Sequence, residues 1–523
     1  MASAVVNILK KTTSLAGATF ASRLLGFLRE ILMAAVLGGG AVASAWAFAF
    51  KVPNLFRRVF GEGLIGTVLI PMMSHTIQRN GRESARKRFS TIFLWLSLIL
   101  GVVCIVVSLI SLLCLRFVTQ EHFVLALKLI PLLMPYCIFI CLIGVMTSVL
   151  NSVKVFFLPA VLSLLLNVFM IACLLWVCPM FDGQPEKMLD SLALSVLLSG
   201  VLELFLMLVL LKRYGFLPGV SKELFLRTRA LLELWHLALP GLAGALAYQF
   251  SVISDAIIAG WISPFAVAAL SYSERLIYLP IGVFAVAFGT VSLTEMSYMA
   301  QKKDYPQLIA TQFSSMRYLL FLTVPLAAFL CVFHIPIIRL TFYRGLFDDR
   351  ALAETAQALF FYSFGIPAFA AMKVTLAGFY SRKDMRTPMF VSIFCVLLNL
   401  VLNLILMHPL KQGGIALSTV ISSYLNNLIL LYLLQRRIGG IPIAATFRFL
   451  SVLMVVSLAG LWPAKQVFDY LLRWGAAKTW FGVFPPLCAG AGVYLAIFLI
   501  LAILLRMDEM KLFFKHFSRK KGA

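Results

Sequence analysis

Long apolar runs are the feature of this sequence that most limits what it can fold into. About fourteen such runs, each long enough to cross a bilayer core as a helix of roughly 20 residues, follow one another along the 523-residue chain. They do not alternate polar and apolar residues over about ten positions, as the strands of a membrane barrel do. A backbone in lipid must satisfy its own hydrogen bonds. The runs therefore predict an all-α polytopic membrane protein.

Composition supports this fold class. Hydrophobic residues make up 62% of the chain and charged residues 13%, and the mean hydropathy is +0.97. A soluble protein of this size has about twice that charged fraction and could not bury so much apolar surface. These values also exclude a disordered chain, a collagen, a coiled coil and a disulfide scaffold.

The basic residues indicate orientation rather than nucleic-acid binding, although the formal net charge is +24. Alternate loops carry about three times as many Lys and Arg residues as the others, which is typical of loops on the cytoplasmic side. An even number of spans places both termini on that side. We therefore expect a multi-pass protein of the bacterial cytoplasmic (inner) membrane with both termini cytoplasmic. The basic segments are 79–88, 212–229, 381–386, 435–437 and the C-terminal tail.

Motifs for catalysis are missing from the sequence. The nine cysteines form no CxxC pair, the six histidines are scattered, and no P-loop, HExxH, GxSxG or GxGxxG occurs. We therefore expect no enzymatic activity, no metal and no cofactor.

An internal repeat indicates how the spans are organised. Residues 150–167 resemble residues 379–399 in order: the end of a span, a short basic loop, a proline and a second span. The offset corresponds to six spans, so the copies have the same orientation, as parallel repeats do. The predicted parts are an N-terminal lobe (1–211), a cytoplasmic basic linker (212–230), a C-terminal lobe (231–437), and two extra spans with a basic tail (438–523).

Charged residues within the apolar runs are the main functional signal. Each buried cation costs about 2.5–3.5 kcal/mol on insertion scales, so several of them predict a water-filled cavity. Lys51, Asn54 and Arg58 share one face of the run 42–74, and Arg57 flanks that face. Prolines and glycines in this run predict a bend. The cavity candidates are Arg23, Arg29, Lys51, Asn54, Arg57, Arg58 and Arg275, with Glu62 and Glu274 as charge partners.

This excess of cations predicts an anionic substrate, with phosphate favoured because guanidinium groups pair well with it. The structural alternative is that these cations form static ion pairs with Glu30, Glu62 and Glu274. A weaker signal is the group Asn399, Asn403 and Thr419, whose oxygens could hold a monovalent cation or only hydrogen-bond between helices. The two last spans could form a groove for lipid tails or pack on the second lobe.

Several long motifs resemble one family. The segments SRLLGFLRE (22–30), AFKVPNLFRRVFGEG (49–63) and VLIPMMS (68–74) are similar to the N-terminal signature of the MurJ (MviN) lipid II flippases, and YSERLIYLPIGVFAVAFGT (272–290), KVTLAGFYSRKDMRTP (373–388) and HPLKQGGIALS (408–418) agree with it. The resemblance implies the multidrug/oligosaccharidyl-lipid/polysaccharide exporter fold, with two six-span lobes around a central cavity and a lipid-tail groove at the last two spans. It also implies alternating-access transport of the undecaprenyl-pyrophosphate-linked peptidoglycan precursor, lipid II, from the cytoplasmic to the periplasmic leaflet.

The same resemblance places the family's essential cations at Arg23, Arg29, Arg57, Arg58 and Arg275, its second-span Lys at Lys51 and its Glu at Glu62. Two positions depart from the family pattern, because Ser44 and Tyr278 stand where an acid is frequent. Expected partners are lipid II, membrane lipids and enzymes of cell-wall synthesis. Coupling to the membrane potential, to Na⁺ or to H⁺ stays open.

Three alternatives remain at this point. A flippase for another polyprenyl-linked glycan would differ in its precursor. A cation-coupled drug exporter of the same fold would need acids in its cavity, and the cationic excess argues against it. A non-transporting scaffold for cell-wall enzymes would have no use for costly charges inside the membrane.

Overall fold

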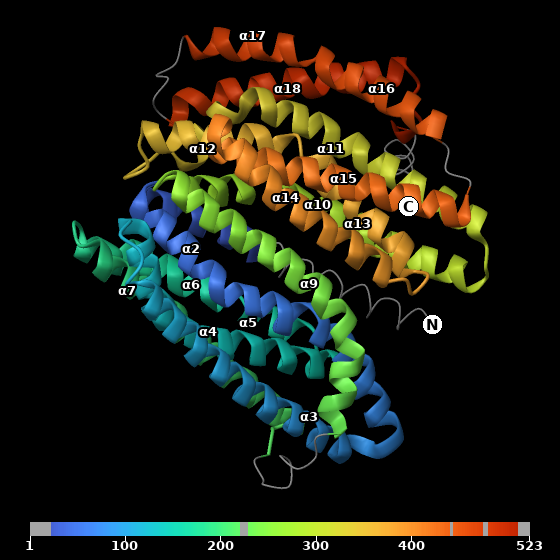
Figure 1. Ribbon diagram of the computed structural model, residues 1–523. Helices are drawn as coiled ribbons and strands as arrows, with labels where there is room; N and C mark the ends of the chain where they lie inside the picture. Colours follow the sequence, from blue (N-terminus) through green and yellow to red (C-terminus); the bar gives the residue numbers. More distant parts are fainter. Residues whose placement is uncertain (1–21, 220–228, 440–442, 474–479, 511–523) are drawn as a thin grey trace. The chain divides into compact units, whose positions relative to one another are not determined.

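The computed structural model describes residues 22–219, 229–439, 443–473 and 480–510, and these ranges contain helices and turns but no strand (Figure 1). The predicted all-α fold is confirmed. By its internal contacts the chain divides into two compact units. Unit 1 is Met1–Ala268 with Arg344–Asp348, and unit 2 is Ala269–Tyr343 with Asp349–Ala523.

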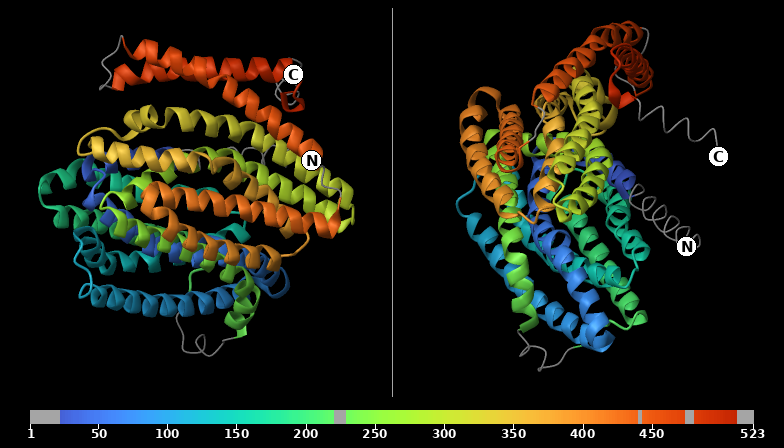
Figure 2. Two further views of the ribbon diagram at one scale, coloured as in Figure 1. Left: turned by 45° about the horizontal axis from the view of Figure 1, so that its top comes forward. Right: turned by 90° about the vertical axis from the view of Figure 1, so that its right-hand side faces the viewer.

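Unit 1 is built around one deeply buried helix. Helix α4 packs against α2, α3 and α7, and in both views of Figure 2 it runs beside α3. Its side chains are apolar on all sides, so it can be covered by protein on all sides. Besides helical residues 22–37, the elements are α2 (Ala41–Phe56), the π-helix η1 (Arg57–Gly63), α3 (Leu64–Cys114), α4 (Glu121–Ser152), α5 (Phe157–Leu162), α6 (Leu165–Ala172), η2 (Cys173–Val177), η3 (Cys178–Phe181), α7 (Pro185–Arg213) and α9 (Arg229–Ile262).

The helical path from α2 to α3 is irregular at two points. The π-helix η1 interrupts it at Arg57–Gly63, within the run whose prolines and glycines predict a bend. Farther on, Gly81 has φ 79° and ψ 171° inside α3, a backbone conformation that only glycine adopts without strain. Gly81 therefore separates the second and third predicted spans, although their helical residues are nearly continuous.

Unit 2 contains the remaining helices, of which α14 and α15 lie side by side. Helices α12 and α13 form one apolar path that bends by 44° between Ser363 and Ile366. The elements are α10 (Ala266–Gln301), α11 (Tyr305–Phe342), α12 (Asp349–Ser363), α13 (Ile366–Tyr380), α14 (Arg386–Leu410), α15 (Gln412–Ile438), α16 (Ile443–Ala459), α17 (Leu461–Leu472) and α18 (Trp480–Leu504).

The C-terminal helices α16, α17 and α18 pack on α11 (Figure 1). Phe333 of α11 lies in one apolar cluster with Ala464 and Phe468 of α17 and Tyr494 of α18. The Tyr494 hydroxyl lies 2.9 Å from the Pro325 carbonyl oxygen and 3.0 Å from that of Ser457. Beyond α18, Glu509 is 3% exposed and pairs with Arg317 of α11 at 2.8 Å. These contacts are those of the alternative in which the last spans pack on the second lobe, and the groove for lipid tails stays a prediction.

The structure also corrects one expectation from the sequence. The charged residues of KQVFDYLLRWGAAKTW (465–480) suggest a loop between the last two spans, but α17 continues to Leu472, so that the helix pair α16–α17 forms one apolar path of 29 residues. The amphipathic segment KQVFDYLL continues the helix because Ala464 and Phe468, one turn apart, both pack on Phe333.

Nine helices of the described residues are long and apolar enough to span a membrane, or ten if α12 and α13 count as one span. The protein is therefore a multi-pass membrane protein, and the expected total of about fourteen stays a prediction. The predicted lobe boundaries at 211, 231 and 437 also stay predictions. By internal contacts α9 groups with unit 1, because it packs on α2, η1 and α3. Residues 220–228 of the predicted linker lie outside the described residues.

Candidate functional site

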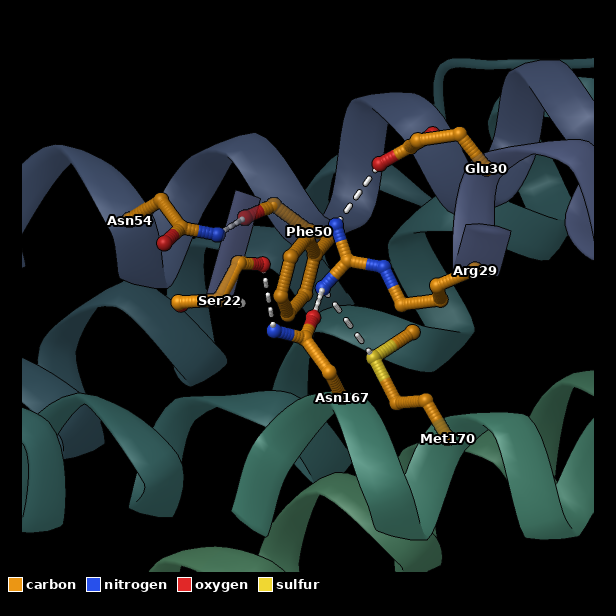
Figure 3. Close-up of polar contacts among 7 residues, drawn as sticks. All are labelled: Ser22, Arg29, Glu30, Phe50, Asn54, Asn167 and Met170. Carbon is orange, nitrogen blue, oxygen red and sulfur yellow. Dashed lines mark hydrogen bonds and ion pairs between the residues drawn. The ribbon is translucent and has the colours of Figure 1, made fainter. Parts of the chain in front are cut away.

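Arg29 is the most deeply buried of the predicted cations in the described residues. It is 6% exposed and lies in the helical stretch 22–37, where one Nη donates to Glu30 Oε1 at 2.6 Å (Figure 3). The other Nη donates to Asn167 Oδ1 of α6 at 3.0 Å and approaches the Met170 sulfur at 3.7 Å. The Asn167 amide also lies 3.5 Å from the Ser22 carbonyl oxygen. Arg29 is thus held by a carboxylate on its own helix and an amide 138 residues away.

The second-span residues form a separate polar group. The Asn54 amide donates to the Phe50 carbonyl at 2.7 Å, and Asn54 Oδ1 accepts from Arg57 Nε at 3.0 Å. Asn54 therefore contacts Arg57, which was predicted to flank the polar face, while Arg58 is exposed. The π-helix begins at Arg57, so regular α-helical spacing does not continue beyond it. The Glu62 side chain lies outside the described residues.

Besides the neutral Asn54, Arg57 has a charged neighbour, Glu203 of α7. Glu203 is 2% exposed and interacts electrostatically with Arg57 across the unit. A buried carboxylate is costly unless a cation or hydrogen bonds offset its desolvation. The sequence interpretation missed Glu203, although an acid in the middle of the apolar segment 191–211 was a signal that could have found it.

Three further predicted cations lie in unit 1. Arg23 and Lys51 are half-buried, Arg58 is exposed, and none of the three forms an ion pair within the described part of the chain. A static ion pair thus describes Arg29, whereas Glu62, another predicted partner, has its side chain outside the described residues. Guanidinium and ammonium groups of this kind are suited to bind anions.

In unit 2, the predicted pair Glu274 and Arg275 lies on α10. Glu274 is half-buried and accepts a hydrogen bond from the Tyr362 hydroxyl at 3.4 Å, whereas Arg275 is exposed. Tyr362 on α12 was not predicted. Its hydroxyl contacts the Glu274 carboxylate, which is adjacent in sequence to Arg275.

The predicted cation-site residues do lie together. Asn403 donates to Asn399 Oδ1 at 3.2 Å, and Asn399 lies 3.4 Å from the Thr419 hydroxyl. This chain of contacts joins α14 to α15. Both asparagines are buried, at 0% and 4% exposure. The geometry fits interhelical hydrogen bonding, and a cation site there stays a prediction.

The two departures from the family pattern have structural roles of their own. Ser44 is fully buried and accepts a hydrogen bond from the Ala268 backbone N–H at 3.1 Å. Tyr278 is 43% exposed and stacks on Phe369 with ring centroids 6.3 Å apart. Neither neutral side chain can provide the charge that an acid would provide.

Metal chemistry has no ready ligand set here. Among the described residues, no three His, Cys, Asp or Glu side chains lie close enough together to hold a metal ion. The arrangement instead offers guanidinium and ammonium groups on the helical residues 22–37, on α2, η1 and α10.

The comparison with known proteins assigns the family. A family model described as lipid II flippase MurJ matches residues 33–473. A probable lipid II flippase MurJ from Rhizobium tropici is 33% identical over 440 residues, which cover 83% of this chain and 82% of that protein. This chain belongs to the lipid II flippase MurJ family.

Other MurJ proteins align over nearly the full length. The probable lipid II flippase MurJ of Vibrio cholerae is 27% identical over 96% of this chain and 98% of its own. A solved lipid II flippase MurJ in an inward closed conformation superposes with a TM-score of 0.77 at 23% identity, covering 94% of this chain and 99% of that one. A solved multidrug resistance MATE family transporter of the MOP superfamily, in an inward-facing conformation, superposes with a TM-score of 0.67 at 18% identity. This match covers 80% of this chain and 95% of that one. The predicted exporter fold is confirmed.

Proposed function

We propose that this protein translocates lipid II from the cytoplasmic to the periplasmic leaflet of the bacterial cytoplasmic membrane by alternating access. Membership of the MurJ family is the observation that carries this proposal. The protein acts as a transporter and breaks no bond of its substrate. Both termini lie in the cytoplasm, as the loop charges predict.

The cations of the first unit fit the most highly charged part of such a substrate, its pyrophosphate. Arg23, Lys51 and Arg58 have donors that no described carboxylate engages, and Arg275 adds an exposed guanidinium on α10. A pyrophosphate brings several anionic oxygens, which pair with guanidinium groups in a bidentate manner. Arg29 differs, because Glu30 and Asn167 already occupy its Nη groups. Its first role is to hold the helix 22–37 against α6, and it binds phosphate only by releasing Glu30.

Transport needs a source of energy that this chain can use. A membrane potential provides about 2.3 kcal/mol per elementary charge per 100 mV, and it acts on the charged groups described above. Coupling to Na⁺ at Asn399, Asn403 and Thr419, or to H⁺, is an alternative. The prenyl tail stays in the bilayer alongside α16 to α18, and enzymes of cell-wall synthesis use the delivered precursor.

The test is leaflet-resolved accessibility of lipid II in cells depleted of the protein. Depletion should leave lipid II in the cytoplasmic leaflet, and the wild-type chain should restore its exposure to the periplasm. Arg58→Ala and Arg275→Ala, at normal expression, should fail to restore it. Lys87→Ala is the matched control, because Lys87 is exposed and, within the described residues, pairs with Glu83 one turn away and with no other acid.

Full rescue by both arginine variants would refute the pyrophosphate interaction. Restored transport of a different polyprenyl-linked glycan, with lipid II unmoved, would identify a flippase of another precursor. Efflux of a cationic dye would favour a drug exporter, the activity named for the MATE transporter with the similar fold.

A further inference from the structure

An arginine-lined pocket opens where four chain segments of unit 2 meet. Its volume is about 640 Å³, and its polar lining comes from the start of α11, the turn between α13 and α14, the start of α14 and the end of α15. We name it the arginine pocket, defined by Tyr305, Arg382, Asp384, Arg386, Thr387 and Arg437. The loop charges place this end of the helices on the predicted cytoplasmic side.

The charges of the arginine pocket do not balance. It contains three guanidinium groups and one carboxylate, that of Asp384. Asp384 accepts hydrogen bonds from the Thr387 backbone N–H at 3.1 Å and the Thr387 hydroxyl at 2.8 Å, and it pairs with Arg437. This one carboxylate is therefore fully engaged as the N-terminal cap of α14 and as the partner of Arg437. The pocket lining therefore has a net excess of two positive charges.

Arg382 is positioned for a ligand that is not part of this chain. Its side chain is half-buried, its guanidinium lies 5.7 Å from the centroid of the Phe379 ring, and its Nε is buried without a hydrogen-bond acceptor. Asp384 attracts Arg382, and Arg437 repels it. Partial burial of positive charge is unfavourable, and an anion bound by Arg382 and Arg386 offsets the excess charge and supplies an acceptor for the buried Nε.

The surface that leads away from the pocket is apolar and faces outward. Phe390, Phe394, Leu397 and Val401 recur on one face of α14, directly beyond Arg386, and are between 53% and 64% exposed. Helix α14 is long and apolar enough to span a membrane. On such a helix, exposed Phe and Leu side chains contact acyl chains.

We propose that the arginine pocket binds the phosphodiester of an anionic phospholipid, with its acyl chains along the Phe390–Val401 face of α14. Arg382 and Arg386 donate to the phosphate oxygens, while Arg437 stays with Asp384. Basic pockets between transmembrane helices on the cytoplasmic side are suited to such head groups. This site is a lipid site additional to the transported substrate and does not depend on the proposed function.

The test uses the full chain in detergent with phosphatidylglycerol as the probe and phosphatidylcholine as the neutral reference. Retained lipid is counted by native mass spectrometry, and the shift in the thermal midpoint is measured against lipid concentration. The variant Arg382→Gln/Arg386→Gln removes the two excess charges and leaves the Asp384 cap in place. Arg436→Gln is the matched control, because Arg436 is adjacent to Arg437 in sequence but stacks on Tyr432 at 5.1 Å and does not line the pocket.

Wild type and Arg436→Gln should retain phosphatidylglycerol over phosphatidylcholine, and the double variant should bind it at least tenfold more weakly with an unchanged midpoint in the absence of lipid. A tenfold loss corresponds to about 1.4 kcal/mol, less than two charge-assisted hydrogen bonds are worth. Equal retention by all three proteins would overturn the proposal in favour of diffuse attraction. Equal stabilisation by millimolar inorganic phosphate, with displacement of the lipid, would overturn the assignment to a phospholipid.

Discussion

Replacing Arg29 tests whether this cation serves mainly the structure of unit 1. In Arg29→Met the side chain keeps its apolar stem but loses the guanidinium that pairs with Glu30 at 2.6 Å and donates to Asn167. Glu30 is 6% exposed, so its carboxylate would lose a cation where water does not replace it. Breaking a buried ion pair from one side costs about 3–5 kcal/mol. Because Glu30 has further interactions, we expect the lower value, about 3 kcal/mol.

The test is a double-mutant cycle in which the free energy of unfolding is measured in mixed micelles for the wild type, the two single variants and the double variant. Arg29→Met/Glu30→Gln removes both charges and should recover most of the loss, because the remaining amide is far cheaper to bury than a carboxylate. The pair Lys87 and Glu83 provides the control, since its side chains are 51% and 71% exposed, and Lys87→Met should change stability by no more than about 0.5 kcal/mol. A loss below 1 kcal/mol in Arg29→Met, or no recovery in the double variant, would refute the structural role of this pair.

Three further predictions concern single positions. Tyr494→Phe should destabilise the packing of α18 on α11 by about 1 kcal/mol, measured as a lower denaturation midpoint, because its buried hydroxyl is the donor near two carbonyl groups; an unchanged midpoint would contradict this. Gly345→Ala should destabilise the protein by more than about 1 kcal/mol, measured as a lower denaturation midpoint. Gly345 has φ 58°, and an added Cβ would lie 2.2 Å from the Ala35 carbonyl oxygen. Burial raises the pKa of Asp384, but the hydrogen bonds from Thr387 and the pairing with Arg437 outweigh burial and hold this pKa below its ordinary value of 3.8. The ionised Asp384 should therefore stabilise the protein above pH 3.8, and this stabilisation should be lost as the pH falls through the lowered pKa. The denaturation midpoints of wild type and Asp384→Asn should differ at about pH 7 and converge in strong acid, and a constant difference would contradict this.

Much of the fold could be predicted because its causes are local in sequence. The apolar run 188–211 must form a helix in lipid, where its backbone finds no other hydrogen-bond partners. The structure has this helix as α7, which extends from Pro185 to Arg213. Gly81 interrupts the helical path within a basic segment that was expected to be a loop. The segment 465–472 was predicted wrongly, because its charged residues suggest a loop while its packing on Phe333 keeps it helical.

The candidate site could be predicted only as a set of residue types. Cations in apolar runs are visible in the sequence because each has a cost of insertion. Which partner each cation takes is not visible, because it depends on helices far apart in the chain. Asn167, which holds Arg29, and Glu203, which faces Arg57, are of this kind.

The sequence by itself thus determined a helical membrane protein of the MurJ family with a surplus of positive charge within its apolar runs. Only the tertiary structure decided that Arg29 is also held by Asn167, 138 residues away, and that arginines from two separate segments share one pocket with Asp384. The physical reason is the separation along the chain of the residues that take part in each interaction. Helix formation in lipid is set by neighbours within about one turn, whereas the pairing of charges is set by which helices pack together.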